Sequence, residues 1–347
     1  MRRPRPPCRR YPGRFAWLLL LTWTVAGSAT PAATTKIDLD TFDSLKKTVA
    51  LPNGERLAYV PIGGPAGAPV VLIHGYTDNA RDWVPLVPYL SPHFHLILVD
   101  LRGHGRSAKP ECCYTRFDFA YDVKLLLDAL GITRADLVGH SLGSIVAQTF
   151  AEFWPERTRR VVLISSTAGP RPDAPPRKPS FDYAAQIRQL KEPLDPGSPF
   201  MLEWWASPTP VDADFMRRQR QDSAAIPVRV WLAVLDQSID PMLDGRDLQN
   251  TLTRLTAPTL LVWGSKDPIM DEEARVTLRA GLPQAQVKIF DGLGHNPFWE
   301  DPRACADLIN GFLTPTRATT AAAGPAARSA SAAASRPDSP PRSQSNR

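Results

Sequence analysis

Cysteine is scarce in this 347-residue chain, and its positions do not indicate a metal site. Zinc sites usually take cysteines two to four residues apart, together with further cysteines or histidines at a similar spacing. The four cysteines stand at positions 8, 112, 113 and 305, and His93 and His95 have no further ligand at a suitable interval. We therefore expect no metal and no other cofactor.

The same cysteines leave the redox state open. Cys112 and Cys113 are neighbours, and a disulfide between neighbours would be strained, so reduced thiols and a single bond to Cys305 both fit the sequence. Cys305 falls at helical spacing within RACADLINGFL, which favours a small, buried apolar role.

Excess positive charge is absent from the body of the chain. The net charge is +6, but residues 1–14 carry six arginines and no acid, and the segment after Leu313 carries five arginines and one aspartate. Residues 15–313 are left with a net charge of −4. This balance gives no basic surface for nucleic acid, so we expect a small-molecule substrate and no nucleic-acid partner. The oligomeric state stays open.

The N-terminal apolar run is shorter than the roughly 20 residues that a membrane-spanning helix needs. This run, Phe15 to Val25, follows six arginines and precedes small residues around Ala29, which is the layout of an export signal. We expect residues 1–29 to be a signal peptide, residues 30–44 to be a spacer, and the mature protein to be periplasmic or secreted. The alternative is an uncleaved segment that anchors the chain to a membrane.

Apolar runs of strand length alternate with helical patterns over much of the remaining chain. Asn53-Gly54 predicts a hairpin. PVVLIHGY and HLILVDLRGHGRS each begin with a continuous apolar run of strand length and end in a glycine-rich loop, and such runs are typical of strands buried on both faces. Helical patterns follow, one ending at Gly131 and the next at Pro155. This alternation predicts an α/β fold with a mostly parallel, doubly wound sheet, built from residues 45–168 and 256–313.

Strand patterns are missing from residues 169–255, which are rich in Pro, Trp and Arg. Several helix-like pieces occur there, so we expect a helical cap inserted over the working edge of the sheet. Its tryptophans at positions 204, 205 and 231 either line an apolar pocket or form the core of the cap. Residues 314–347 lack the apolar side chains needed to pack, and we expect a disordered, low-complexity tail.

Ser141 stands between Gly139 and Gly143 in DLVGHSLGSIVAQTF, where a strand-like run changes to a helix-like one. A sharp turn at this point strains the backbone of its central residue, leaves room only for glycine on either side and exposes the hydroxyl. The turn also aims the amide of Leu142 at developing negative charge. Ser141 is therefore a candidate nucleophile, and a helix cap is its alternative role.

A serine hydroxyl is a weak nucleophile at neutral pH, so the chemistry needs a histidine base and an acid that orients it. His295 follows a strand in FDGLGHNPFWEDP, and Asp267 follows a strand in VWGSKDPI. The carboxyl ends of parallel strands gather such groups at one edge of a sheet. Asp271 is the alternative acid, and its other role is a charge in the first turn of a helix.

Five motifs occur in a fixed order between residues 45 and 313: HGYTD, DLRGHGRS, GHSLG, GSKDPI and GLGHNPFWEDP. Taken together, they resemble the α/β-hydrolase superfamily, in its single-domain branch with a helical cap. The resemblance implies that Ser141 is the nucleophile, His295 the general base and acid, and Asp267 its partner. It also implies an oxyanion hole formed by the backbone amides of Tyr76 and Leu142.

The implied function is hydrolysis of a carboxylic ester through an acyl-serine intermediate. A serine at position 141 argues against the relatives built around an aspartate nucleophile, and GHSLGS departs from the GGSWGG of the aminopeptidase branch. Three alternatives stay open: cofactor-free perhydrolysis of the haloperoxidase type, hydrolysis of a carbon–carbon bond, and a non-catalytic binding role. The sequence does not name the ester.

Other polar residues in these motifs are expected to have structural roles. His74 is expected to order the oxyanion loop. His140 is expected to point away from the nucleophile on its strand, with its hydrogen bonds satisfied. The segment DLRGHGRS resembles a structural loop of the family, and its polar residues include Asp100, Arg102 and His104.

Overall fold

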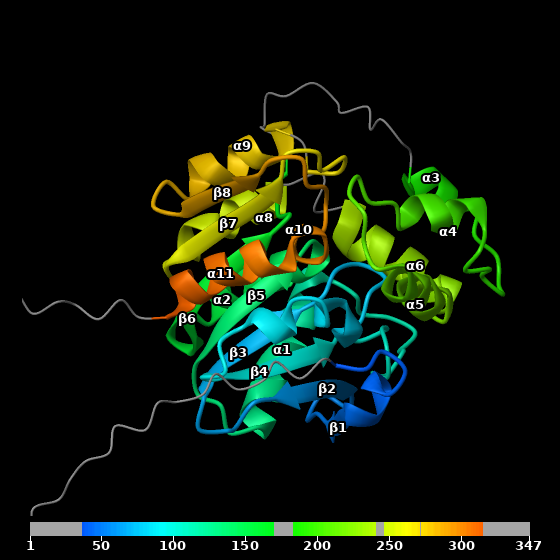
Figure 1. The fold of residues 1–347 in the computed structure, drawn as a ribbon. Coiled ribbons are helices and arrows are strands. Elements are labelled where there is room, and N and C mark those ends of the chain that lie inside the picture. Colours follow the sequence, from blue (N-terminus) through cyan, green and yellow to red (C-terminus); the bar gives the residue numbers. More distant parts are fainter. Residues whose placement is uncertain (1–36, 170–182, 241–245, 271, 315–347) are drawn as a thin grey trace, which may run out of the picture. The chain divides into compact units, whose positions relative to one another are not determined.

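The computed structural model describes residues 37–169, 183–240, 246–270 and 272–314 (Figure 1). The expected signal peptide (residues 1–29), the expected tail beyond residue 314 and the alternative acid Asp271 lie outside these residues. Among the residues that the structure describes, no helix has both the length and the apolar character needed to cross a membrane.

An eight-stranded sheet forms the centre of the fold, in the order β1-β2-β4-β3-β5-β6-β7-β8. β1 (Lys47–Ala50) and β2 (Arg56–Ile62) form an antiparallel hairpin, and β2 also pairs antiparallel with β4 (Phe94–Asp100). Gly54 turns the hairpin with a φ of 88°, which glycine adopts without a steric penalty. The predicted hairpin at Asn53-Gly54 is confirmed.

The remaining strand pairs are parallel. They join β4 to five further strands: β3 (Ala68–Ile73), β5 (Ala135–His140), β6 (Thr158–Ile164), β7 (Thr259–Gly264) and β8 (Gln286–Phe290). Every residue of β5 and β7 is buried, which explains why β7 is a continuous apolar run rather than an alternating pattern. The mostly parallel sheet confirms the predicted α/β fold class.

Helices flank this sheet in the order that the sequence patterns predict. α1 (Arg116–Ala129) begins with a capping box between Thr115 and Asp118, and Gly131 follows its end with a φ of 67°. α2 (Leu142–Phe153) ends just before Pro155, which opens the short 3-10 helix η4 (Pro155–Arg157). The C-terminal part adds three more helices: α9 (Glu272–Gly281), α10 (Pro297–Glu300) and α11 (Pro302–Leu313).

The described residues between β6 and β7 contain helices and no strand. These helices are α3 (Tyr183–Ile187), α4 (Pro199–Trp204), α5 (Ala213–Ala224), α6 (Val228–Val234), the π-helical turn η5 (Leu235–Ile239), α8 (Arg246–Thr251) and the 3-10 helix η6 (Leu252–Arg254). In Figure 1, α3 to α6 lie together on one side of the sheet, and we call them the cap. α5 turns Phe215, Gln219 and Ser223 inward at four-residue spacing.

The ordered fold begins before the end of the expected spacer. Residues 42–45 form the 3-10 helix η1 (Phe42–Leu45), and the ring of Phe42 is completely buried. The guanidinium of Arg81 lies 5.2 Å from the centre of that ring. A single aromatic residue in a polar segment gives no periodic signal, so the sequence pattern did not indicate that Phe42 is buried.

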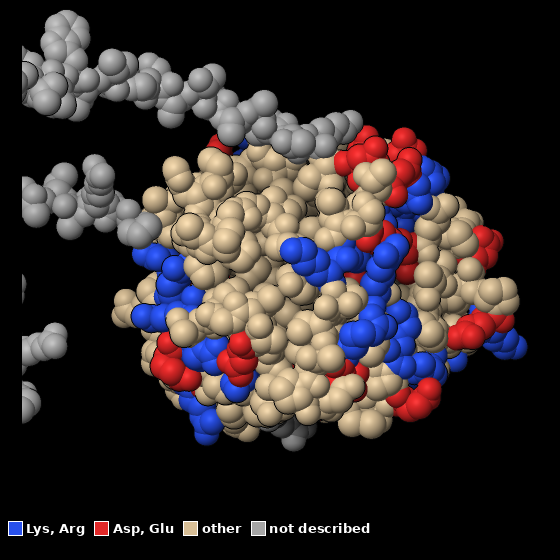
Figure 2. Space-filling model, turned by 90° about the horizontal axis from the view of Figure 1, so that it is seen from below, with Lys and Arg blue, Asp and Glu red and all other residues tan. Residues whose placement is uncertain are grey.

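Charges of both signs are interspersed on the face seen in Figure 2. Lysine and arginine side chains stand beside aspartate and glutamate side chains there, and much of the remaining surface is uncharged.

Candidate active site

Ser141 occupies the turn between β5 and α2, and its backbone adopts a φ of 49° and a ψ of −117°. A non-glycine residue with positive φ is strained, and such strain persists only where the surroundings enforce it. Two glycines make the turn geometrically feasible. A Cβ on Gly139 would lie 2.2 Å from the carbonyl oxygen of Gly143, and a Cβ on Gly143 would lie 2.1 Å from that of Ile73.

Replacing Gly143 with alanine is expected to destabilise the fold by about 3 kcal/mol or more, because backbone atoms cannot move away from the new methyl group. Gly311 in α11 is the matched control, since a Cβ there would meet no atom within 4 Å. Gly311→Ala is expected to leave stability unchanged or to raise it by up to about 1 kcal/mol. Urea unfolding of both variants measures the contrast, and equal stabilities would contradict the packing argument.

Ser141 does not act as a helix cap in this geometry. It occupies the N-cap position of α2, but its side chain accepts no capping hydrogen bond. Ser198 shows the alternative at the start of α4, where its hydroxyl oxygen accepts a hydrogen bond from the amide of Met201 at 3.3 Å. The strained turn of Ser141 therefore serves to present its hydroxyl.

Asp267 and His295 lie together in the folded structure. His295 Nδ1 donates to both carboxylate oxygens of Asp267, at 3.0 and 2.9 Å. Because Nδ1 carries this proton, the neutral ring keeps its free lone pair on Nε2. His295 and Ser141 line the same cavity.

The carboxylate of Asp267 is buried and remains ionised. Burial raises its pKa, but the charge and the hydrogen bond of His295 and the amides of Met270 and Ile269 outweigh burial and lower the pKa to about 2. Both amides donate to Oδ1 at 2.9 Å. Asp267 is therefore negatively charged at neutral pH and lies next to His295. Its charge keeps the proton of the neutral His295 ring on Nδ1 and would stabilise the imidazolium form of His295.

The main chain of His295 is held by two further side chains. Its carbonyl oxygen accepts from Ser165 Oγ at 2.7 Å and from His140 Nε2 at 3.1 Å. The rings of His140 and His295 lie 5.0 Å apart in an edge-to-face arrangement. The loop that carries His295 is thus fixed from its backbone as well as through Asp267.

The prediction that the hydrogen bonds of His140 are satisfied is wrong. His140 contributes to the lining of the cavity that holds Ser141, and its Nδ1 has no hydrogen-bond partner among the described residues. Burial and the nearby charge of His295 lower the pKa of His140 well below its usual range.

Two backbone amides are free to form an oxyanion hole. Leu142 is the first residue of α2, and Tyr76 follows the end of β3 in the loop behind Gly75. Within the described residues, neither amide donates a hydrogen bond to another group. The phenol of Tyr76 donates to the carbonyl of Trp231 at 2.6 Å, which fixes this loop against the cap.

A cavity of about 130 Å³ lies between the sheet edge and the cap. Ser141 and His295 form part of its floor, and Trp204 and Trp205 contribute to its wall. Trp231 is fully buried and packs edge-on against Tyr76, with ring centres 5.6 Å apart. Trp204 and Trp205 therefore line the apolar pocket, whereas Trp231 belongs to the core of the cap.

Sequence reasoning missed two buried carboxylates beside this cavity. Asp78 and Asp82 are 3% and 0% exposed, and burial raises the pKa of each carboxyl well above its usual range. An oxygen of each lies 3.9 Å from His140 Nδ1. Asp78 closes the HGYTD motif, so the motif itself was the available signal.

Residues 68–302 match the family described as the alpha/beta hydrolase fold. The chain belongs to this family. An uncharacterised protein of Mycobacterium tuberculosis is 30% identical over 293 residues, which cover 76% of this chain and 80% of that protein. Lipase 3 of a Moraxella species is 26% identical over 272 residues, which cover 77% and 84% of the two chains. The crystal structure of a bacterial membrane phospholipase A gives a TM-score of 0.65 at 26% identity, covering 77% and 85%.

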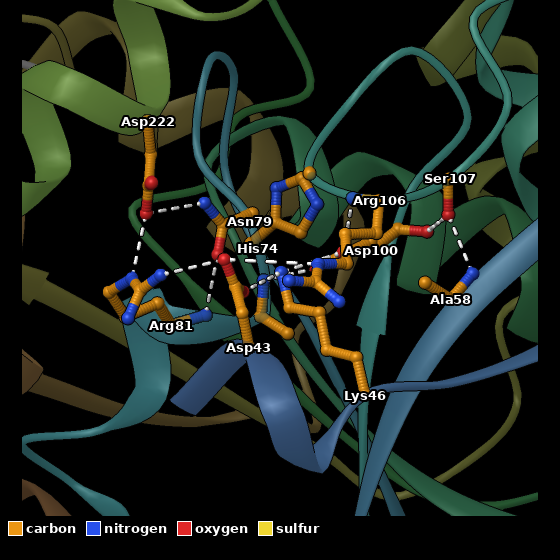
Figure 3. A network of polar contacts seen from close by, with 12 residues as sticks. Asp43, Lys46, Ala58, His74, Asn79, Arg81, Asp100, Arg106, Ser107 and Asp222 are labelled. Carbon is orange, nitrogen blue, oxygen red and sulfur yellow. Dashed lines mark hydrogen bonds and ion pairs between the residues drawn. The ribbon is translucent and has the colours of Figure 1, made fainter. Parts of the chain in front are cut away.

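In this α/β hydrolase, a polar network links the loop after β3 to the cap (Figure 3). Arg81 Nε and Asn79 Nδ2 both donate to Asp222 Oδ2 in α5, each at 2.8 Å. Arg81 also pairs with Asp43 at 3.1 Å, and its side chain is only 3% exposed. The segment that begins at Tyr76 is therefore held by the cap on one side and by the N-terminal residues on the other.

Removing the charge of Asp222 is expected to destabilise the protein by about 2 kcal/mol, because the buried guanidinium of Arg81 loses one of its two carboxylate partners. Asp214 on the same helix is the matched control. It pairs with Arg217 at the surface, so Asp214→Asn is expected to cost less than about 0.5 kcal/mol. Thermal or urea unfolding of the two variants would contradict this reading if both losses were equally small.

The loop after β4 has the structural role that its resemblance implied. Asp100 accepts hydrogen bonds from the amides of Ala80 and Arg106, each at 2.8 Å, and pairs with Lys46 at 2.8 Å (Figure 3). Arg102 pairs with buried Asp122 through two nitrogens at 2.6 Å.

The histidines of this region are also tied to the backbone. His74 Nδ1 lies 2.8 Å from the carbonyl of Gly75, and His74 Nε2 accepts from the amide of Leu101 at 3.0 Å, so His74 links the oxyanion loop to β4. His104 Nδ1 lies 2.8 Å from the carbonyl of Arg102, and burial lowers the pKa of His104 to about 4.

The three cysteines within the described residues are free thiols. Cys112 and Cys113 are exposed, whereas Cys305 is completely buried in α11. Burial raises the pKa of the Cys305 thiol far above its usual range, in keeping with the apolar role that its helical spacing favours.

Proposed function

We propose that this protein is a serine hydrolase that cleaves a carboxylic ester through an acyl-serine intermediate. One observation carries the proposal: Ser141 and His295 line the same cavity, and His295 Nδ1 donates to the buried, ionised carboxylate of Asp267. Ser141 has a strained backbone, and its side chain makes no capping hydrogen bond. A helix cap needs none of these partners, whereas nucleophilic catalysis needs all of them. The lipase among the relatives supports the ester as substrate class.

In the first half of the reaction, His295 Nε2 takes the proton of Ser141 as the hydroxyl oxygen attacks the ester carbonyl. The amides of Tyr76 and Leu142 donate to the oxygen that becomes negative. The intermediate collapses when the carbon–oxygen bond to the alcohol breaks and His295 returns its proton to the leaving alkoxide. The products of this half are the free alcohol and an acyl group on Ser141.

In the second half, a water molecule attacks the acyl-serine while His295 takes one of its protons. The same two amides hold the second oxyanion, and the proton passes to Ser141 as the carboxylic acid leaves. Asp267 keeps its charge throughout and stabilises the imidazolium that forms twice per turnover.

The cavity walls indicate the substrate class. Most of its lining side chains among the described residues are apolar or aromatic, from α3, α4, η5 and the segment after β7: Tyr183, Ala184, Ile187, Trp204, Trp205, Leu235, Ile239, Ile269 and Met270. We infer that the acyl or alcohol part of a small ester is apolar.

A substrate panel tests this proposal against its alternatives. The purified protein is assayed with p-nitrophenyl acetate, butyrate and octanoate, with peroxide plus halide, and with a 1,5-diketone of the kind cleaved at a carbon–carbon bond. We expect ester hydrolysis to exceed the other two activities by at least 100-fold in kcat/KM. Dominant halide oxidation or diketone cleavage would replace the ester assignment, and no turnover of any substrate would favour a binding protein.

We further propose that the protein is exported, on the strength of the arginine-rich and apolar pattern of residues 1–29. The test is the N-terminal sequence of the protein purified from its native host, read by mass spectrometry. A mature chain starting near Thr30 supports cleavage and release. An intact Met1 in the membrane fraction would show an anchored enzyme, and an intact Met1 in the cytosol would contradict export.

A further inference from the structure

Three buried side chains converge behind the proposed nucleophile. Asp78 lies in the loop after β3, Asp82 in the 3-10 helix η2 (Ala80–Trp83), and His140 at the end of β5. Each is at most 3% exposed. One oxygen of each carboxylate and Nδ1 of His140 all lie within 4.8 Å of one another, and Nδ1 is 3.9 Å from both oxygens.

The tautomer of His140 leaves this group of three side chains without a positive charge or a proton donor at its centre. His140 Nε2 lies 3.1 Å from the carbonyl oxygen of His295, which can only accept, so Nε2 carries the proton. In the neutral ring, Nδ1 then presents a lone pair toward two carboxylates. Three electron-rich atoms face one another, and 3.9 Å is too long for a direct hydrogen bond between them.

Two of these three atoms, His140 Nδ1 and Asp82 Oδ2, make no hydrogen bond within the described residues. Asp78 faces His140 through Oδ2, and its other oxygen, Oδ1, has no hydrogen-bond partner there. No described lysine or arginine pairs with either carboxylate. Buried polar atoms without partners are rare in folded proteins and usually mark a bound water or ion. The lone pair and the two carboxylates specifically favour a positive charge at the centre.

The distances and the surrounding contacts fit a metal ion. With these separations, a point exists within roughly 2.5 Å of all three atoms, and a small inward movement would bring it to the 2.0–2.2 Å typical of zinc bonds. Histidine ligands usually donate their second N–H to a carbonyl, as His140 does to His295. Asp82 is likewise oriented from outside, because its Oδ1 accepts from Gln219 Nε2 at 3.2 Å.

The cluster is also accessible from the cavity. Asp78 and His140 both line the cavity that holds Ser141, so an ion can enter there and a water molecule can complete its coordination. The ligands come from positions 78, 82 and 140, a spacing that matches no metal motif. The sequence pattern therefore does not indicate this group of ligands, and no metal was expected from it.

We propose that Asp78, Asp82 and His140 form a binding site for one divalent transition-metal ion of the zinc class. The ion neutralises the two buried carboxylates and links the oxyanion loop to the strand that ends at Ser141. The site is distinct from the acid–base pair of Asp267 and His295, and it stands whether or not the ester assignment is correct.

Cobalt and zinc binding to the full chain test the proposal. The protein is freed of metal with a chelator, titrated with Co²⁺ while its visible absorption is recorded, and then equilibrated with Zn²⁺ for metal analysis. We expect one ion per chain with a Kd in the micromolar range or below. Asp82→Asn and His140→Gln should each weaken binding by at least 30-fold.

Two controls separate this site from others. Asp240→Asn removes a carboxylate of the cavity wall that already pairs with Arg188 at 2.7 Å, and it should leave binding unchanged. His295→Gln should also retain the ion. Binding that is lost in His295→Gln but kept in Asp82→Asn would place the metal on the acid–base pair and overturn the proposal.

The thermal stability of the wild-type protein gives a further test, which does not depend on whether the variants fold. Saturation with Zn²⁺ at about 100 times Kd should raise the Tm by about 5 °C, because the ion binds the folded chain alone. If the wild-type chain shows neither a cobalt absorption band nor a rise in Tm, the cluster holds a water molecule or a shared proton and the metal site is refuted.

Discussion

Replacing Ser141 with alanine is expected to lower kcat/KM for p-nitrophenyl butyrate by about 10⁴-fold or more and to abolish the initial burst of p-nitrophenol. Without the hydroxyl, the cavity still binds the ester and the two amides still face its carbonyl, but no acyl group can be stored. Residual activity should be only that of water attacking a bound ester.

Ser198→Ala is the matched control for this variant, because both serines stand at the N-cap of a helix. Loss of the Ser198 capping bond should cost about 1 kcal/mol of stability and leave the burst intact. Ser141→Ala should show the reverse pattern, with a lost burst and no loss of stability. A burst that survives in Ser141→Ala, together with a loss of stability, would show that Ser141 is a cap after all.

Replacing Asp267 with asparagine is expected to lower kcat by about 10³- to 10⁴-fold. Asparagine keeps the shape of the side chain but supplies no negative charge, and its amide can stabilise the wrong tautomer of His295. Asp271→Asn tests the alternative acid and should retain nearly full activity. Stopped-flow and steady-state kinetics on both variants decide, and a large loss in Asp271→Asn with little loss in Asp267→Asn would reverse the assignment.

Asp267→Asn is also expected to change how the free energy of unfolding depends on pH. The pKa of Asp267 is lowered from 3.8 to about 2 in the folded protein, so its ionisation stabilises the fold above pH 4, and this contribution is lost as the pH falls through the folded-state pKa. Between pH 5 and pH 3 the stability difference between wild type and Asp267→Asn should shrink by about 1 kcal/mol. Urea unfolding at the two pH values measures it, and a difference independent of pH would contradict an ionised, hydrogen-bonded Asp267.

The sheet could be predicted because strands that are buried on both faces consist of consecutive apolar residues. LLVWG in β7 and LVG in β5 are apolar without alternation, and each is followed by a turn or helix signal. The positions of Asp267 and His295 followed from the same logic, since both lie in loops that follow a strand. The bond between them confirms the spatial pairing, while their catalytic roles stay predictions.

The residues around the cavity could not be predicted because their roles depend on contacts between distant segments. Arg81 meets Asp222 across 141 positions, and His140 meets the carbonyl of His295 across 155. The path of the cap helices was equally hidden, because amphipathic spacing shows which face is buried but not what covers it.

The most direct test of the central claim is to trap the acyl-enzyme. The protein is mixed with p-nitrophenyl acetate, quenched in acid within the burst phase, digested and analysed by mass spectrometry. We predict one acetyl group per chain, located on the peptide that contains Ser141 and absent from Ser141→Ala. An acetyl group on another residue, or an enzyme that hydrolyses the ester with no acyl group on Ser141, would contradict it.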